Sequence, residues 1–310
     1  MNTLTTITKI ELKKLFKRKD SWFMFTILLV PILYSVGLAV NSDVITYTGA
    51  GNITAIGFAN AMFQMSQSMF IFNVILSAII GRSLASEIEN KSIRLYINRV
   101  GVRKLIYLGK ELSLLLFSIF IDILLVLTSI IFYYAVLIHN PKVASGILYD
   151  SNAGMEIAQI ICNCMFWLIT IYLVMLTATK LKTLVCVGTY MILYIIMNLM
   201  SYMDGIKYLS PLHYIVAVSS NTLQFTFSTM IFSLYTICMG ILFTHIGIRR
   251  IEKWIYKKSS KPSRASQRQV NGLCLPLTAP SVLAGGELRG DSKKVLPSFS
   301  IIEERVSVHD

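Results

Sequence analysis

Residues 83–112 read SLASEIENKSIRLYINRVGVRKLIYLGKEL, and this charged segment lies between two long apolar stretches. It carries six Lys or Arg and three Glu, whereas 55% of the whole chain is apolar and only 15% is charged. About a quarter of the residues are charged in a typical soluble domain. The composition therefore predicts a membrane protein, and the charged segment marks a place where the chain leaves the bilayer.

Six stretches are apolar enough to cross a membrane, which takes roughly 20 residues for ~30 Å of hydrocarbon. Each should be an α-helix, because a helix satisfies its backbone hydrogen bonds within the span. The spans cover residues 21–40, 57–80, 112–138, 157–179, 184–203 and 225–248. We predict an all-α integral membrane protein with one six-span domain over residues 21–258. Residues 259–310, rich in Ser, Pro and Gly, are expected to be a disordered cytoplasmic tail or an appended segment.

Lysine and arginine residues are distributed unevenly between the connections. Six precede span one, seven lie between spans two and three, two lie between spans four and five, and twelve follow span six. The other three connections hold only Lys142 and Lys207. Because positive residues stay on the cytoplasmic side of short loops, we expect both termini and the loop at residues 83–111 to be cytoplasmic. Anionic lipid at that surface accounts for the net charge of +13 without a nucleic-acid partner.

The first 20 residues have two faces when they are placed on a helix. The segment LTTITKIELKKLFKRK, residues 4–19, gathers apolar side chains opposite basic ones. Its basic residues include Lys9, Lys13, Lys14 and Lys17. We predict that residues 1–20 form an amphipathic elbow helix in the membrane interface. Glu11 falls on the apolar side, where it either pairs with a cation from another cytoplasmic element or reaches out to the lipid surface.

The sequence lacks the motifs of enzymatic and metal chemistry. The segment most similar to a phosphate-binding Gly-x-x-x-x-Gly-Lys-Ser/Thr loop is GVRKLIYLGKEL, but Gly101 and Gly109 are too far apart and Glu follows Lys110. Cys162 and Cys164 are two positions apart, so a helix points them to different faces, and the four histidines are scattered. We expect no catalytic site, no metal site and no nucleotide bound by this chain.

Two features of the spans are candidates for a role inside the membrane. Asp122 lies about 15 Å from Leu112 along a helix that rises 1.5 Å per residue, which places its carboxyl group near the middle of the bilayer. It is either a proton site, or a protonated or hydrogen-bonded group that holds helices together with Ser118, Thr128 or a tyrosine. The other feature is a methionine stripe that either lines a substrate path or packs between helices. Its members are Met62, Met65 and Met69.

The charged loop is suited to docking a soluble partner, because a charged rim guides encounter and register; alternatively it only sets the topology. The segments IELKKLFKRKDSW and ASEIENKSIRLYINRVGVRKLIYLGKEL resemble the membrane subunits of type-2 ABC exporters. These six-span permeases are associated with bacteriocin immunity and with peptide and drug export. In that family an elbow helix precedes span one, and the loop between spans two and three carries an acidic stretch, a Gly-Thr-like pair and a basic return.

Individual residues of the loop follow this family pattern. Glu87 and Glu89 match the acidic stretch, whereas Lys91-Ser92 departs from the Gly-Thr pair. The basic return is matched by Arg103, Lys104 and Lys110. The resemblance implies that a short helix fits a cleft on an ATPase subunit and couples ATP hydrolysis to transport. Its coupling residues would be Glu87, Ile88, Glu89, Asn90 and Lys91, together with Arg103 and Lys104.

The resemblance also implies partners and a cargo. ATP and Mg²⁺ would be bound by separate cytoplasmic ABC ATPase subunits, and a second permease chain, identical or related, would complete the path. The abundance of Ile, Lys and Asn is typical of a low-GC Gram-positive bacterium, so we expect the plasma membrane as the location. The cargo would be amphipathic or hydrophobic, such as an antimicrobial peptide or toxin. The alternatives are a proton-coupled secondary carrier that uses Asp122, and a non-transporting membrane scaffold or receptor subunit.

Overall fold

The computed structural model describes residues 3–40, 52–90, 92–93, 102–220 and 225–259. All regular elements in these ranges are helices, and no strand occurs there. Six helices are long and apolar enough to cross a membrane, in agreement with the predicted fold class. The predicted tail from residue 260 onward and the middle of the charged loop lie outside the described residues.

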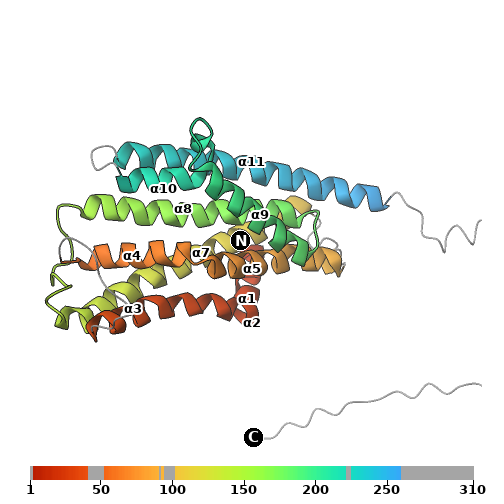
Figure 1. Ribbon diagram of the computed structural model, residues 1–310. Coiled ribbons are helices and arrows are strands. Elements are labelled where there is room, and N and C mark those ends of the chain that lie inside the picture. The colour runs from red at the N-terminus through yellow and green to blue at the C-terminus, as the bar shows by residue number, and fades with distance from the viewer. Residues whose placement is uncertain (1–2, 41–51, 91, 94–101, 221–224, 260–310) are drawn as a thin grey trace, which may run out of the picture. The chain divides into compact units, whose positions relative to one another are not determined.

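The helices follow the chain in a simple order (Figure 1). Before the second span they are α1 (Thr3–Lys17), α2 (Lys19–Trp22), η1 (Phe23–Leu28) and α3 (Leu29–Ala39). Span two comprises α4 (Ala55–Ser68) and α5 (Phe70–Glu89). The remaining elements are α7 (Arg103–Ala135), η2 (Leu137–His139), α8 (Ala153–Ala178), α9 (Thr183–Met200), η3 (Lys207–Leu209), α10 (Pro211–Ser220) and α11 (Phe225–Ser259).

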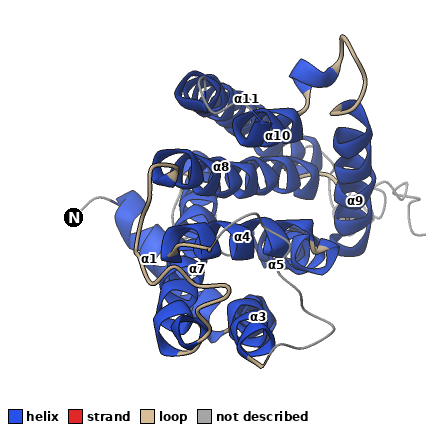
Figure 2. Cartoon of the chain, turned by 60° about the vertical axis from the view of Figure 1, so that its left-hand side comes forward, coloured by secondary structure: helices blue, strands red, loops and turns tan. Residues whose placement is uncertain are grey.

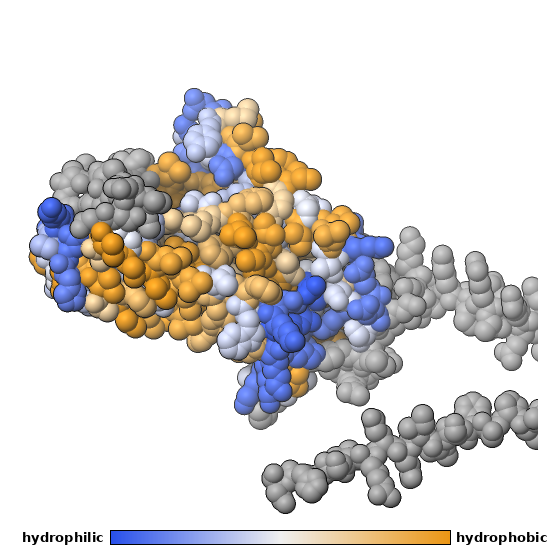
Figure 3. Space-filling view, turned by 60° about the horizontal axis from the view of Figure 1, so that its bottom comes forward, coloured by the Kyte–Doolittle hydropathy of each residue, from blue (hydrophilic) through white to orange (hydrophobic). Residues whose placement is uncertain are grey.

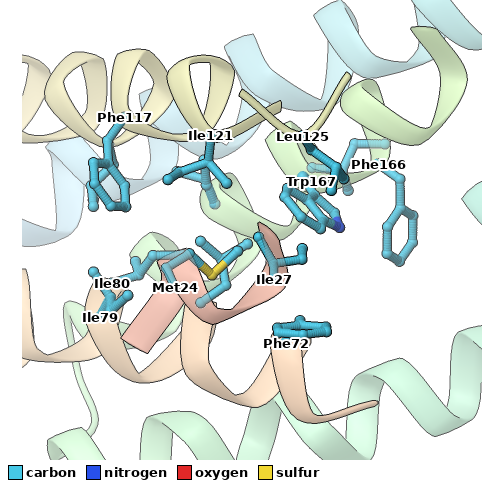
Figure 4. Close-up of a cluster of buried hydrophobic side chains, with 14 of the residues drawn as sticks. Met24, Ile27, Phe72, Ile79, Ile80, Phe117, Ile121, Leu125, Phe166 and Trp167 are labelled. Carbon is cyan, nitrogen blue, oxygen red and sulfur yellow. The ribbon is translucent and has the colours of Figure 1, made fainter. Parts of the chain in front are cut away.

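Helix α8 lies in the middle of the bundle and contacts α4, α5, α7, α9, α10 and α11 (Figure 2). On one side of it lie α3, α4 and α7, and on the other lie α10 and α11, while α9 crosses at the edge. Apolar side chains from η1, α5, α7 and α8 interlock in the core (Figure 4). On the face shown in Figure 3, apolar side chains dominate the middle of the bundle and hydrophilic ones gather toward its two ends, as expected for a membrane protein.

Span two differs from its prediction, because the expected helix over residues 57–80 is interrupted. Met69 has φ −69° and ψ 101°, an extended conformation that separates α4 from α5. The Asn73 side-chain amide donates a hydrogen bond of 3.1 Å to the carbonyl of Gln67 and so satisfies an acceptor that the interruption leaves free. After the interruption the helix continues to Glu89, nine residues beyond the predicted end of the span.

Helix α10 completes the part of the bundle that follows α9. The Tyr235 hydroxyl donates a 3.1 Å hydrogen bond to the carbonyl of Leu209, just before α10 begins. The Tyr214 ring stacks on Phe232 with 5.7 Å between the ring centroids. Because these partners lie within the first eleven residues of α11, α10 runs alongside the beginning of that helix.

The first turns of α1 pack directly on α7 at Gly109. A Cβ atom at this position would lie 2.6 Å from Ile7 Cγ2 and 3.2 Å from Ile7 Cβ, which is closer than a normal van der Waals contact. The missing side chain therefore lets the two helices approach. Gly188 in α9 is the opposite case, because a Cβ atom there would meet nothing within 4 Å.

We expect Gly109→Ala to lower the stability of the purified protein, because the overpacking cost of about 1–3 kcal/mol exceeds the gain of about 1 kcal/mol from alanine in a helix. Gly188→Ala is the matched control and should leave the unfolding temperature unchanged or raise it. Thermal unfolding of both variants in the same detergent measures the difference. Equal unfolding temperatures would show that α1 does not pack closely on α7.

Candidate functional site

Lys110, near the start of α7, is the centre of a buried ion cluster. Its side chain is 0% exposed, and its Nζ atom lies 2.8 Å from Glu11 Oε2 and 2.9 Å from Glu87 Oε2. The Ser83 carbonyl accepts a third hydrogen bond of 3.3 Å. These three acceptors match the three N–H groups of an ammonium ion. The cluster thereby joins α1, α5 and α7.

Glu11 extends the cluster to a second lysine, because its Oε1 atom lies 2.8 Å from Lys14 Nζ. Positive and negative groups thus alternate from Lys14 through Glu11 and Lys110 to Glu87, and their formal charges cancel. Burial alone would raise the pKa of the Glu11 carboxyl, but the ammonium groups of Lys110 and Lys14 outweigh it and hold this pKa below its ordinary value. Glu11 is therefore ionised at neutral pH, with both of its oxygens engaged.

The end of α5 makes further polar contacts around this cluster. Arg82 forms an ion pair with Asp20 of α2. Glu89 accepts a 3.3 Å hydrogen bond from the Thr183 hydroxyl at the start of α9. Residues 82–89 of α5 thus make polar contacts with α2, α7 and α9, and they are connected to α1 through Lys110. We call this segment the α5 end.

Two contacts join α7 to α11 nearby. Lys104 Nζ lies 3.8 Å from Glu252 Oε1, and both side chains are partly exposed. About two turns further along α7, Glu111 is buried and accepts a 2.5 Å hydrogen bond from the Thr244 hydroxyl. Lys110 and Glu111 are neighbours in sequence, yet they bind different helices, so the start of α7 is held on both sides.

The structure separates the predicted coupling residues into two groups. Glu87 is largely buried in the ion cluster, and Ile88 packs against the core. Glu89 and Asn90 are exposed at the helix terminus, and Lys104 is exposed on α7. Lys91 and the side chain of Arg103 lie outside the described residues. Only the exposed residues of this set are accessible to a partner.

The predicted elbow segment is helical, and its basic residues differ from its acidic residue in exposure to solvent. Lys13 and Lys17 are exposed, whereas Glu11 is only 3% exposed. Of the two alternatives for Glu11, pairing with a cation from another element is confirmed, and the cation is Lys110. The position of α1 in a membrane interface stays a prediction.

Asp122 is buried in α7, but the partners suggested for it from the sequence are wrong. The Thr128 hydroxyl donates to the carbonyl of Leu124, and the Ser118 hydroxyl has no partner among the described residues. Neither carboxylate oxygen of Asp122 accepts a hydrogen bond of ordinary geometry there, and the weak donor beside it is the Cys164 thiol on α8. The site therefore consists of one carboxyl group and one thiol.

The three methionines do not form one exposed stripe. Met62 is buried in the core of the bundle, which favours the packing alternative for this residue. Met65 and Met69 are half-buried, and Met69 occupies the interruption of span two.

Sequence reasoning missed a group of carboxamides in spans two and four, in which Gln64 is exposed and the other members are buried. Asn60 and Gln64 in α4 both hydrogen-bond to Gln159 in α8, the latter at 2.9 Å. Gln67 and Asn163 lie one turn further along the same helices. Their spacing, i, i+4 and i+7 in span two and i, i+4 in span four, was a readable signal for a polar stripe within apolar spans.

Comparisons with known proteins add no assignment. No protein-family model matches the chain, and no curated protein matches it at a significant level. Among the described residues, no group of three or more His, Cys, Asp or Glu is arranged to hold a metal ion. The features of this chain that bear on its function are therefore the ion cluster, the α5 end and the carboxamides.

We expect Lys110→Met to lower the stability by about 3–5 kcal/mol, because it leaves two buried carboxylates without their shared cation. The triple variant Glu11→Leu, Lys110→Met, Glu87→Leu removes all three charges and should recover most of that loss. Thermal unfolding of both variants in lipid nanodiscs provides the comparison. A single variant as stable as the wild type, or a triple variant no better than the single one, would contradict the role assigned to the cluster.

Proposed function

We propose that this chain is the membrane-spanning permease subunit of an ATP-driven ABC exporter in the plasma membrane. Separate cytoplasmic ATPase subunits would bind ATP and Mg²⁺, and a second permease chain would complete the path for an amphipathic or hydrophobic substrate. The observation that carries the proposal is the set of contacts at the α5 end. This segment forms the beginning of the charged loop and is connected to four other helices.

The contacts suggest how a motion of the loop reaches the spans. An ATPase that docks at Glu89 and Asn90 would push or pull α5 along its axis. The buried ion cluster would carry that displacement to α1 and α7, because a buried ammonium cannot leave its carboxylates without a large cost. The interruption at Met69 gives span two a place to bend, so that α5 can move relative to α4.

Burial also determines which substitution tests docking of the ATPase without disturbing the fold. Replacing Glu87 would disturb the buried cluster, so a loss of transport would not separate docking from folding. Glu89 is exposed, and its one described contact is the hydrogen bond from Thr183. Thr183→Ala removes that bond without changing the charge of the docking surface. Asp204, exposed on the connection after α9, offers a charge reversal away from the α5 end.

We predict that Glu89→Lys lowers ATP-driven export in inside-out vesicles at least several-fold and weakens retention of the ATPase subunit. The expected physical reason is the reversal of charge on the rim that guides docking. Thr183→Ala and Asp204→Lys should retain most of the wild-type transport. All three variants should unfold at nearly the wild-type temperature, which separates docking from stability.

Unchanged ATPase retention and export in Glu89→Lys would count against docking at the α5 end. Transport that follows an imposed proton gradient without ATP and disappears in Asp122→Asn would instead establish the secondary carrier. The buried carboxyl group of Asp122 is the observation that favours this second candidate. A chain that binds a soluble partner but moves no substrate would establish the scaffold alternative.

A further inference from the structure

Near the interruption of span two lie two carboxamide side chains, Gln67 and Asn163, that have atoms without a hydrogen-bond partner among the described residues. Asn163 in α8 is 0% exposed, and neither its Oδ1 nor its Nδ2 atom has a hydrogen-bond partner among the described residues. Gln67 in α4 is 6% exposed, and its Nε2 atom is equally unpartnered there. A buried polar group without a partner is destabilising, so such groups in a folded protein call for an explanation.

The neighbouring carboxamides show that the unpaired atoms are not a general feature of this stripe. One turn earlier on the same two helices, Asn60 and Gln64 both bind Gln159. Asn73, just after the interruption, uses its amide on the Gln67 carbonyl, and its Oδ1 atom accepts a 3.4 Å hydrogen bond from the Tyr190 hydroxyl. The unsatisfied atoms are thus confined to Gln67 and Asn163 within this stripe.

Gln67 and Asn163 line the same cavity, which has a volume of about 240 Å³. Two further carboxamides, Gln64 and Asn198, also border it. The side of the cavity contributed by α10 is aliphatic and includes Leu212 and Ile215. No charged side chain belongs to the described lining, so the cavity is suited to a neutral ligand that has both hydrogen-bonding and apolar parts.

We infer that this cavity binds an uncharged amide-bearing segment of a hydrophobic peptide. A carboxamide presents a donor and an acceptor side by side, which complements the C=O and N–H groups that a single residue of an extended peptide presents on the same side. Inside a membrane a peptide needs such partners, because lipid offers none. The aliphatic wall from α10 would receive one apolar side chain. The volume is below the roughly 300–1,000 Å³ of sites for drug-sized ligands, so the cavity would hold one part of a longer molecule.

This inference rests on the proposed function only where it identifies the bound peptide as cargo. Binding itself is testable on the full chain in lipid nanodiscs without any ATPase. Failure of the exporter assignment would therefore leave the binding result standing, and failure of binding would leave the exporter assignment standing.

The probe is a diazirine analogue of leucine that is capped as an N-acetyl amide, and mass spectrometry locates the residues it labels. We expect saturable labelling of α8 or α10 that N-acetyl-leucinamide displaces. N-acetyl-leucinate has the same shape and a negative charge, and it should displace the probe poorly. Asn163→Leu should reduce labelling roughly tenfold, because the hydrogen bonds of that amide to the ligand are lost.

Stability distinguishes a ligand-binding amide from a structural one. Asn163→Leu replaces an unpartnered polar group by an apolar one of similar volume, so the unfolding temperature should stay constant or rise. Asn60→Leu removes an amide that is paired with Gln159, so it should lower the unfolding temperature. Glu89→Lys should label like the wild type, because it lies outside the cavity.

Several results would overturn the inference. Absence of saturable labelling in the wild type would mean that the amides hold water only. Labelling that persists in Asn163→Leu, or a fall in the unfolding temperature of this variant, would assign Asn163 a structural role. Displacement of the probe by methyl glucoside more readily than by N-acetyl-leucinamide would assign the cavity to sugar hydroxyl groups instead of peptide amides.

Discussion

The Lys110 ammonium is buried away from water, and its two carboxylate partners come from two other helices, α1 and α5. Glu11 lies 99 residues before Lys110, and Glu87 lies in the last turn of α5. Burial of such an ion is costly unless its N–H groups are all used, and the Ser83 carbonyl supplies the third acceptor. This requirement fixes the position of α1 across α7 and of the α5 end beside both. Gly109 makes the same arrangement sterically possible, because it removes the side chain that would separate α1 from α7.

These contacts hold the helix end from which the charged loop continues. The exposed residues Glu89 and Asn90 stand at the end of a helix whose previous turns are held by α1, α2, α7 and α9. A displacement applied at this terminus is therefore shared between several spans. Further along the same span, the interruption at Met69 coincides with the carboxamides and with the cavity that Gln67 and Asn163 line. A single broken helix thus connects the proposed docking surface to the proposed binding site.

The helical class and the number of spans followed from hydropathy. Six of the described helices are long and apolar enough to cross a membrane, so their number was predicted correctly, and five of the six were placed close to the observed helices. The break in span two was not predicted, because hydropathy averaged over a span does not report backbone conformation. The partner of Glu11 was predicted only as an unspecified cation, since the identity of Lys110 depends on how α1 crosses α7. The carboxamide stripe was visible in the spacing of Asn60, Gln64 and Gln67, but the contact with α8 required the tertiary fold.

The most direct measurement is gentle purification of the chain from its native membrane, followed by identification of the proteins that accompany it and by an assay of ATP hydrolysis. A permease of the proposed kind should bring with it a soluble subunit that carries a nucleotide-binding Gly-x-x-x-x-Gly-Lys-Ser/Thr motif, in a fixed ratio to the membrane chain, and the complex should hydrolyse ATP. A chain that is purified alone and supports no ATP hydrolysis would contradict the assignment.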